Sequence, residues 1–183
     1  MDRDSKLLFR KKVLNLTAKK RVNNYKKDKL IIERLKNYIQ NSNLQDIMLF
    51  LPLKNEVNIM PLIKLLRERG YNLYVPYMEG ESFRPVKYRL PLFKKKFNIK
   101  EPKNSLRRVK KIDLAIVPIL GIDKSFRRVG YGKGMYDRFF AKEGKKVKKT
   151  LFLERDIYYS SQIITDFFDI KADLLCTNSF IRV

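Results

Sequence analysis

Short, nearly continuous apolar runs recur along the chain, and helical patterns separate them. The run at 46–51 reads DIMLFL, and runs of similar character stand at 71–77 and 113–118. Runs this short fit strands that are buried on both faces. Strands that alternate with helices predict a parallel sheet with right-handed crossover connections. We therefore expect an α/β fold, a three-layer α/β/α arrangement with a mainly parallel central sheet, formed as a single domain over residues 1–183.

The expected elements follow from the spacing of apolar residues. Helices are expected at 6–20, 25–39, 58–69, 134–141 and 158–164, and strands at 46–51, 71–77, 83–88, 113–118, 151–153 and 174–177, the last extended by 179–183. Asp4 and Ser5 are N-cap candidates for the first helix, and Gly70 is placed to end the third. Pro85 predicts an edge position for its strand, because proline removes a hydrogen-bond donor from the ladder. Residues 78–104 otherwise show little periodicity.

The chain is strongly basic. Its 42 Lys and Arg residues against 19 Asp and Glu give a formal net charge of +23 at pH 7. Such a charge favours anionic partners: nucleic acids, nucleotides, polyanionic metabolites or anionic membrane surfaces. A solvated lysine-rich surface is the commonest explanation, and the basic stretches at 19–29, 94–111 and 142–149 contain no nucleic-acid-binding motif. We expect no specific nucleic-acid partner.

The residue types that the chain lacks exclude several kinds of chemistry. There is no histidine, so Ser-His-Asp catalysis and histidine-bound zinc are excluded. A metal would have to be held by oxygen atoms, which favours magnesium. Cys176 is the only cysteine, so no disulfide can form within the chain. No apolar run approaches the ~20 residues that span a bilayer, and the first residues are too charged for a secretory signal. We expect a soluble cytoplasmic protein without a membrane partner.

A glycine-rich stretch follows the apolar run that ends at Pro118. Arg128 introduces three alternate glycines, GYGKG, and a helical pattern begins directly after them. Glycine lets the backbone take positive φ and come close to a ligand, while successive N–H groups and a helix N-terminus attract anions. The stretch therefore indicates a main-chain cradle for phosphate, with a plain flexible loop as the alternative. Its spacing is not that of a P-loop, so another nucleotide-dependent kinase or ligase remains a weaker reading.

Two further features have chemical meaning beside the glycines. Lys6 and Arg10 stand four residues apart, so they share one face of the first expected helix. Two cations on one face can bind a polyphosphate, although such residues are more often simply solvated. Glu56 follows the first expected strand, at the carboxyl end of a parallel strand where α/β sheets usually bind ligands.

These features belong to an ordered set that covers nearly the whole chain. The set consists of Lys6-x-x-x-Arg10, Asn55-Glu56-Val57, Glu101-Pro102, Val117-Pro118, Asp123, the block from Arg128 to Arg138, Asp169-x-x-x-Asp173 and Thr177. In this order and spacing the chain closely resembles the 5-formyltetrahydrofolate cyclo-ligase family, also called methenyltetrahydrofolate synthetase. The block R-x-G-Y-G-K-G-x-Y-D is its most specific part. Val129 and Met135 depart from the family's usual residues, and 78–100 matches only loosely, which leaves the contacts to the folate tail unassigned.

The resemblance implies an ATP-dependent enzyme of one-carbon folate metabolism. It would convert 5-formyltetrahydrofolate and ATP to 5,10-methenyltetrahydrofolate, ADP and phosphate, with Mg2+ as cofactor. Phosphorylation of the formyl oxygen would create a leaving group, and N10 would then close the ring. This route needs no covalent enzyme intermediate, which agrees with the missing histidine. The implied partners are the two small-molecule substrates, and the implied state is a monomer.

The resemblance also implies residue roles around ATP. Phosphoryl transfer needs positioning and charge neutralisation more than acid–base catalysis. The expected ATP-binding residues are Lys6, Arg10, Arg128, Val129, Gly130, Tyr131, Gly132, Lys133, Gly134, Met135 and Tyr136. Magnesium is expected at Asp137, because a hard cation that bridges phosphates needs a nearby carboxylate. Asp169 is expected to be a second metal-linked carboxylate, with a structural salt bridge as a near-equal alternative.

The remaining roles concern the folate and the chemical step. Leu51, Glu56 and Tyr136 are expected to contact the folate, with Glu56 accepting hydrogen bonds from the donor edge of the pterin. Arg10, Lys133 and Tyr136 are expected to act directly in catalysis.

Overall fold

The computed structural model describes residues 3–19, 23–94, 100–103, 108–178 and 180–182. The helices are α1 (Arg3–Lys19), α2 (Asn24–Gln40), α3 (Met60–Glu68) and α4 (Met135–Glu143), with a 3-10 turn, η2 (Gly144–Lys146). The strands are β1 (Asp46–Met48), β2 (Asn72–Glu79), β3 (Ser82–Lys87), β4 (Leu92–Lys94), β5 (Lys100–Pro102), β6 (Leu114–Pro118), β7 (Gly121–Asp123), β8 (Arg128–Val129), β9 (Thr150–Leu153), β10 (Tyr159–Ser160), β11 (Leu174–Cys176) and β12 (Phe180–Arg182).

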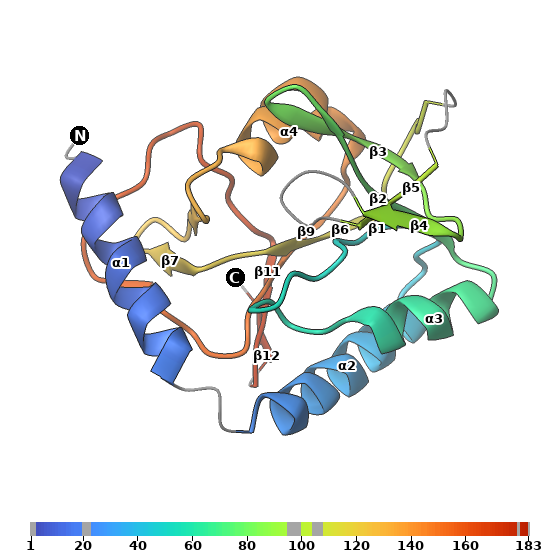
Figure 1. Ribbon diagram of the computed structural model, residues 1–183, viewed down its shortest axis with the longest axis horizontal. Helices are drawn as coiled ribbons and strands as arrows, with labels where there is room; N and C mark the ends of the chain where they lie inside the picture. Colours follow the sequence, from blue (N-terminus) through green and yellow to red (C-terminus); the bar gives the residue numbers. More distant parts are fainter. Residues whose placement is uncertain (1–2, 20–22, 95–99, 104–107, 179, 183) are drawn as a thin grey trace.

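A central sheet organises these elements (Figure 1). Within the described residues it has seven strands in the order β12-β11-β9-β6-β1-β2-β3. The pairs from β11 through β9, β6 and β1 to β2 are parallel, and the edge strands β12 and β3 are antiparallel. The mainly parallel sheet and the edge position of Pro85 in β3 were both correctly predicted. From β1 the chain moves outward to β2, and from β6 it moves outward the other way, so the carboxyl ends of β1 and β6 form a topological switch point.

Helices cover both faces of this sheet. Residues of α2 and α3, among them Leu35 and Leu62, join one buried cluster with β1, β2, β6 and β9. On the opposite face Phe139 of α4 packs with Val117 and Phe152. Figure 1 shows α4 above the sheet and α2 with α3 below it. This confirms the predicted α/β fold with helices on both faces.

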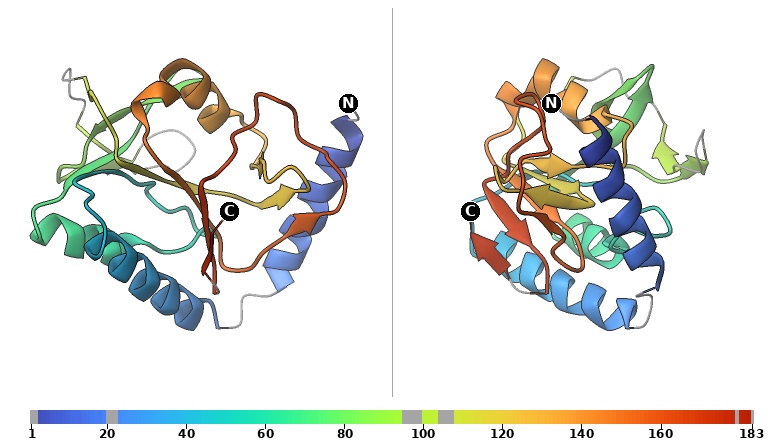
Figure 2. Two further views of the ribbon diagram at one scale, coloured as in Figure 1. Left: turned by 180° about the vertical axis from the view of Figure 1, so that it is seen from behind. Right: turned by 90° about the vertical axis from the view of Figure 1, so that its left-hand side faces the viewer.

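Helix α1 is placed differently from the other helices. Figure 2 shows that it stands apart from the layer of α2 and α3. It lies against β7 of a small sheet with the order β10-β7-β8. A Cβ added at Gly121 would stand 2.5 Å from the backbone carbonyl oxygen of Tyr158 and 2.9 Å from the ring of Phe9. Only glycine therefore lets α1 come this close to β7, and Phe9 lies between Lys6 and Arg10 in the sequence.

Several predicted boundaries differ from the structure. Strand β1 ends at Met48 rather than at residue 51, although the amide of Leu49 still donates to the carbonyl of Tyr74. Helix α1 already includes Arg3, so the N-cap role predicted for Asp4 and Ser5 is wrong. Asp4 lies in the first turn instead, where its charge favours the helix dipole.

The end of the chain holds two larger differences. No helix forms at 158–164; instead Tyr159–Ser160 pairs with β7. The carboxylate of Asp123 accepts the amide N–H groups of Ile164 and Thr165 at 2.9 Å, so these amides are bonded outside their own segment instead of within a helix. Residues 180–182 do not continue β11 but return beside it as the antiparallel strand β12.

The stretch with weak periodicity also contains strands. β4 and β5 form an antiparallel pair beyond β3, with Phe93 opposite Glu101. In the described part of the chain, no helix is long and apolar enough to cross a membrane.

Candidate functional site

The glycine-rich loop between β8 and α4 is the centre of the site. Gly132 and Gly134 have φ angles of 98° and 62°, which favour glycine, and Gly134 is the N-cap of α4. A Cβ at Gly130 would overlap the guanidinium of Arg128. The loop therefore needs glycine at all three positions, two for backbone conformation and one for space.

A charged cavity of about 350 Å³ lies on one side of this loop. It is lined by Lys6, Arg10, Arg128, Gly130, Gly132, Gly134, Asp137, Arg138, Ala141, Phe168 and Asp169. Helix α1, the glycine loop, α4 and the turn before residue 170 each contribute to it. These parts are far apart in the sequence, and they come together in space because α1 lies against β7.

The cations of the charged cavity are already paired with its acids or with the backbone. Lys6 binds the carboxylate of Asp169 directly and that of Asp166 at 3.7 Å. Arg128 lies 3.4 Å from the carboxylate of Asp137. Arg10 donates from Nε to the carbonyl of Gly130 at 2.9 Å. Arg10 thus joins α1 to the glycine loop, while the two ion pairs keep opposite charges next to each other inside the cavity.

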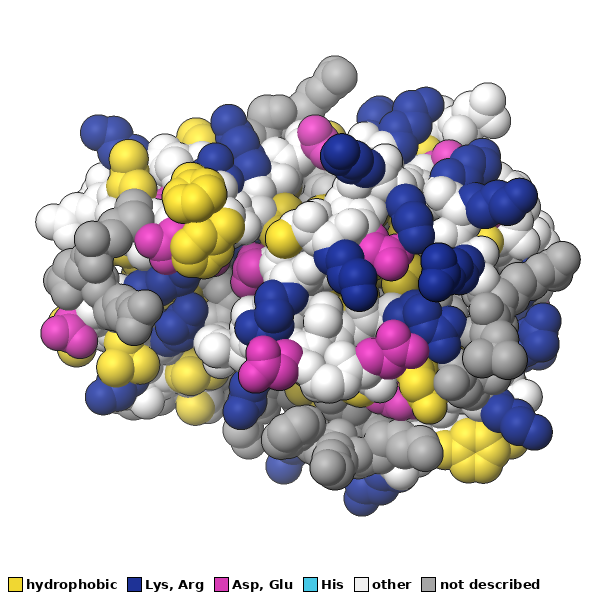
Figure 3. All heavy atoms as spheres, turned by 90° about the horizontal axis from the view of Figure 1, so that it is seen from above, with side chains coloured by type: hydrophobic (Ala, Val, Ile, Leu, Met, Phe, Trp, Pro, Cys, Tyr) yellow, Lys and Arg dark blue, Asp and Glu magenta, His cyan; other side chains and the backbone are white. Residues whose placement is uncertain are grey.

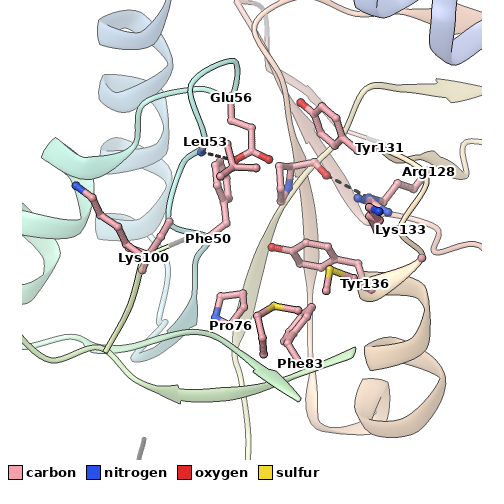
Figure 4. Close-up of a pocket in the computed structure, with 15 residues that line it drawn as sticks. Phe50, Leu53, Glu56, Pro76, Phe83, Lys100, Arg128, Tyr131, Lys133 and Tyr136 are labelled. Carbon is pink, nitrogen blue, oxygen red and sulfur yellow. Dashed lines mark hydrogen bonds between the residues drawn. The ribbon is translucent and has the colours of Figure 1, made fainter. Parts of the chain in front are cut away.

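An apolar cavity of about 250 Å³ lies on the other side of the loop (Figure 4). It is lined by Phe50, Leu51, Leu53, Glu56, Pro76, Met78, Phe83, Lys100, Pro118, Arg128, Tyr131, Lys133, Gly134, Met135 and Tyr136. Most of these residues lie at or beyond the carboxyl ends of β1 and β6, on β2, or in the glycine loop. The cavity therefore stands at the switch point of the sheet, where the order of the strands reverses.

Glu56 places a carboxylate in this apolar cavity. Its side chain is 8% exposed, and one oxygen accepts the amide N–H of Leu53 at 2.8 Å. Burial raises the pKa of Glu56 above its ordinary value of 4.5, although the Leu53 amide and the positive charges of Arg128 and Arg155 oppose the rise. Arg155 also fixes the backbone here, since it donates to the carbonyl of Glu56 at 2.6 Å. The carboxylate is thus held in place on the wall of the apolar cavity.

Tyr136 forms part of the floor of the apolar cavity. Its ring contacts Phe83 edge-on, with centroids 4.9 Å apart, and the guanidinium of Arg128 lies 5.0 Å above it. Burial, followed by the negative charge of Glu56, raises the pKa of the phenol. Tyr136 therefore keeps its proton at neutral pH and can donate a hydrogen bond.

Arg128 lines both cavities. Its Nε donates to the carbonyl of Pro118 at 3.1 Å, at the carboxyl end of β6. Its guanidinium also contacts Asp137 on the charged side and the ring of Tyr136 on the apolar side. The guanidinium is therefore a charge fixed in the wall between the charged cavity and the apolar cavity.

The fold and this arrangement agree with comparisons to known proteins. Residues 3–169 match the model of the 5-formyltetrahydrofolate cyclo-ligase family. The chain belongs to this family. The 5-formyltetrahydrofolate cyclo-ligase of Mycoplasma genitalium is 26% identical over 146 residues, which cover 76% of each chain. The enzyme of that name from Mus musculus is 28% identical over 79% of this chain and 78% of its own.

A solved structure gives the same result. The 5,10-methenyltetrahydrofolate synthetase of Aquifex aeolicus has a TM-score of 0.77 and 27% identity, covering 97% of this chain and 92% of that one. The predicted family, the enzymatic activity of a cyclo-ligase and the place in folate metabolism are thereby confirmed. ATP is implied as the second substrate, because the cyclo-ligase family is ATP-dependent.

The structure distributes the predicted site residues over both cavities. Lys6, Arg10, Gly130, Gly132, Asp137 and Asp169 line the charged cavity; Leu51, Glu56, Tyr131, Lys133, Met135 and Tyr136 line the apolar cavity; Arg128 and Gly134 line both. Tyr131, Lys133 and Met135, which were expected around ATP, thus line the apolar cavity and not the charged one. Val129 lines neither cavity, since it is fully buried in β8 opposite Gly121.

Some lining residues were missed in the sequence. Arg138, Ala141 and Phe168 belong to the charged cavity, and Phe50, Leu53, Pro76, Met78, Phe83, Lys100 and Pro118 to the apolar one. Position next to a strand end could have found Phe50 and Pro118. Phe168 stands next to Asp169, but an exposed aromatic residue in a turn gives no signal of its own.

Proposed function

We propose that the enzyme binds 5-formyltetrahydrofolate in the apolar cavity and the phosphates of ATP in the charged cavity. The observation that carries this proposal is the shared wall, because Arg128 and Gly134 line both cavities. A formyl group on one side and a terminal phosphate on the other would then meet at one fixed guanidinium. Such positioning supplies much of the acceleration in a reaction between two bound substrates.

The proposed reaction has two steps. The formyl oxygen attacks the γ-phosphorus of ATP, the bond to the β-phosphate oxygen breaks, and ADP is released. N10 of the folate then attacks the formyl carbon and loses its proton, and the bond from that carbon to the phosphorylated oxygen breaks, which releases phosphate. Arg128 and the Tyr136 hydroxyl are placed to stabilise negative charge near the formyl oxygen. Lys133, which lines the same cavity, adds a further positive charge there.

The ion pairs of the charged cavity are the basis for ATP binding. Lys6 and Arg128 now face the carboxylates of Asp169 and Asp137. Phosphate oxygens can replace these carboxylates as partners of the cations. Arg10 already contacts the glycine loop, so it is placed to bind a phosphate that lies over the loop.

We assign a magnesium ion to the carboxylates of Asp137 and Asp169, which both line the charged cavity. Within the described residues, no three His, Cys, Asp or Glu side chains form a cluster that could enclose a metal. Mg2+ does not need one, because it is commonly held by one or two carboxylates together with substrate phosphates and water. Asp137 and Asp169 would hold it, and it would neutralise phosphate charge during transfer.

Glu56 and Leu51 are assigned to the pterin. The pterin presents two N–H donors along one edge, and an ionised Glu56 can accept both. The free donors of an unpaired pterin would be costly in this apolar setting. Leu51 and Tyr136 then contact the flat faces of the ring system. The cytoplasmic location and monomeric state stay predictions.

A turnover assay tests the proposal. Purified protein with ATP, Mg2+ and 5-formyltetrahydrofolate should produce the methenyl product, followed by its absorbance, together with one ADP for each product molecule. A product that forms without ADP release would contradict the phosphorylation step. ADP release without folate would show that the two cavities do not act together.

A further inference from the structure

We propose that Phe168, supported by Phe167, forms a stacking surface for the adenine base of ATP at the rim of the charged cavity. This inference rests on the proposed binding of ATP phosphates in that cavity. It assigns a partner to the adenine base, for which neither the cations nor the glycine loop provide a contact.

The turn that carries these two residues is firmly attached to the phosphate side of the site. The amide of Asp166 donates to the carboxylate of Asp169 at 2.7 Å, and the amide of Asp169 donates back to the carbonyl of Asp166 at 3.0 Å. Arg127 holds the turn from outside through the carbonyl of Asp169 at 2.6 Å. Both acids also face Lys6. The turn and the predicted phosphate-binding lysine are therefore one connected unit.

The two aromatic rings project from this turn instead of entering the core. Phe167 is 86% exposed and Phe168 is 57% exposed. Their centroids lie 5.4 Å apart with the rings 76° to one another, an edge-to-face contact that fixes each ring against its neighbour. Two adjacent phenylalanines left in water are unfavourable by the hydrophobic effect. Coverage by a flat apolar ligand would remove that disadvantage.

The position of Phe168 identifies the ligand. Phe168 lines the charged cavity together with Lys6 and Asp169. A nucleotide whose phosphates occupy this cavity must carry its ribose and base outward past the rim. Aromatic side chains bind nucleobases by stacking and do so without hydrogen-bond readout. Figure 3 shows apolar side chains gathered on the side of α1 and the segment that precedes β11, and Lys and Arg gathered on the side of β3, β4 and β5. The apolar side is where a base would be received.

The test separates the base from the phosphates. Binding of ADP and of pyrophosphate, each with Mg2+, is measured by titration calorimetry on the full chain. Phe168→Ala should weaken ADP binding roughly 10-fold and leave pyrophosphate binding unchanged. Phe168→Tyr should restore ADP affinity, because it retains an aromatic face. Phe167→Ala should have a smaller effect in the same direction. Phe93→Ala is the matched control, since Phe93 is 46% exposed and lies on β4; it should change neither affinity.

Three results would overturn the inference. Phe168→Ala could leave ADP binding unchanged, or weaken ADP and pyrophosphate equally, which would mean a general effect on the turn. Sedimentation could instead show a wild-type dimer that Phe168→Ala separates, which would assign the rings to a second copy of the chain. Failure of the proposed function is distinguishable, because it would appear as wild-type protein that releases no ADP in the turnover assay.

Discussion

The two cavities beside the glycine loop are built on different principles. The apolar cavity is lined by strand ends and large side chains, with Glu56 as a nearly buried carboxylate on its wall. The charged cavity is lined by α1, the loop and α4, and its Lys6 and Arg128 are paired with Asp169 and Asp137. One cavity offers an apolar shape with a buried carboxylate on its wall; the other offers charges that are already paired with one another.

This difference teaches how each substrate would be recognised. In the proposed arrangement, a pterin would gain its binding energy from burial and its orientation from Glu56. A nucleotide gains less from burial, because its phosphates must displace existing ion pairs. Mutations on the two sides should therefore have distinct kinetic signatures, as expected for Asp137, Glu56 and Tyr136; a fourth variant probes stability outside both cavities.

The largest effect is expected from Asp137→Asn in the charged cavity. Loss of the carboxylate removes a proposed magnesium ligand and leaves Arg128 without its acidic partner. We expect kcat to fall about 10³-fold while binding of a folate analogue persists, measured by ADP release and by calorimetry. Glu143→Gln is the control, because Glu143 ends the same helix and pairs only with Lys146 among the salt bridges described. Near-normal kcat in Asp137→Asn would remove it from the metal site.

Glu56→Gln should alter the apolar cavity instead. The amide presents an N–H group where the pterin also presents one, so KM for the folate should rise about 100-fold. Calorimetry should show unchanged ADP affinity. In the wild type, KM should also rise as the pH falls through the raised pKa of Glu56, because protonation removes the acceptor; the variant should lack this dependence. Equal losses for folate and ADP would erase the distinction between the cavities.

Tyr136→Phe tests the part of the apolar cavity that lies beside Arg128, the residue that lines both cavities. The ring, its contact with Phe83 and the Arg128 guanidinium above it would all remain, and only the hydroxyl would be lost. We expect kcat to fall about 10-fold, as for one neutral hydrogen bond to a developing charge, with little change in KM for either substrate. Single-turnover measurements isolate the chemical step. An effect on folate KM alone would mean that the hydroxyl serves binding.

The smallest effect concerns stability at a buried carboxylate outside both cavities. Burial raises the pKa of Glu154 from 4.5 to about 7. The folded protein then keeps a proton that the unfolded chain releases, so this contribution to stability is lost as the pH rises from about 4.5 to about 7. Glu154→Gln should raise the free energy of unfolding at pH 8 by about 3 kcal/mol and leave it unchanged at pH 4, measured by urea denaturation. A pH-independent difference would contradict the raised pKa.

The sequence predicted those parts of the molecule that depend on local patterns. Continuous apolar runs located the parallel strands, since a strand buried on both faces has no polar side. The glycines located the loop, because two of them need positive φ. The order of motifs brought Glu56, Asp137 and Asp169 into one site region.

The parts that were missed depend on contacts between distant residues. Residues 158–164 have a helical pattern, but the carboxylate of Asp123 accepts the amide of Ile164 and that of Thr165 directly after it, and a charged acceptor outweighs a weak local preference. Lys133 lies between two glycines with positive φ, so its direction follows from the turn and not from its place in the motif. A role for Phe168 can be inferred only from the folded structure, in which α1 brings Lys6 to the turn that carries Phe168.

Arg128 has a consequence beyond the chemical step. One guanidinium, fixed by the carbonyl of Pro118 and flanked by Asp137 and Tyr136, is part of the wall of both cavities. A ligand that shifts this group on one side also changes the surface that the other ligand meets. Thermodynamic linkage requires that whatever factor ADP imposes on folate affinity, the folate imposes the same factor on ADP. In the proposed arrangement the two substrates would therefore not bind independently, and Arg128 would be the residue that couples their affinities.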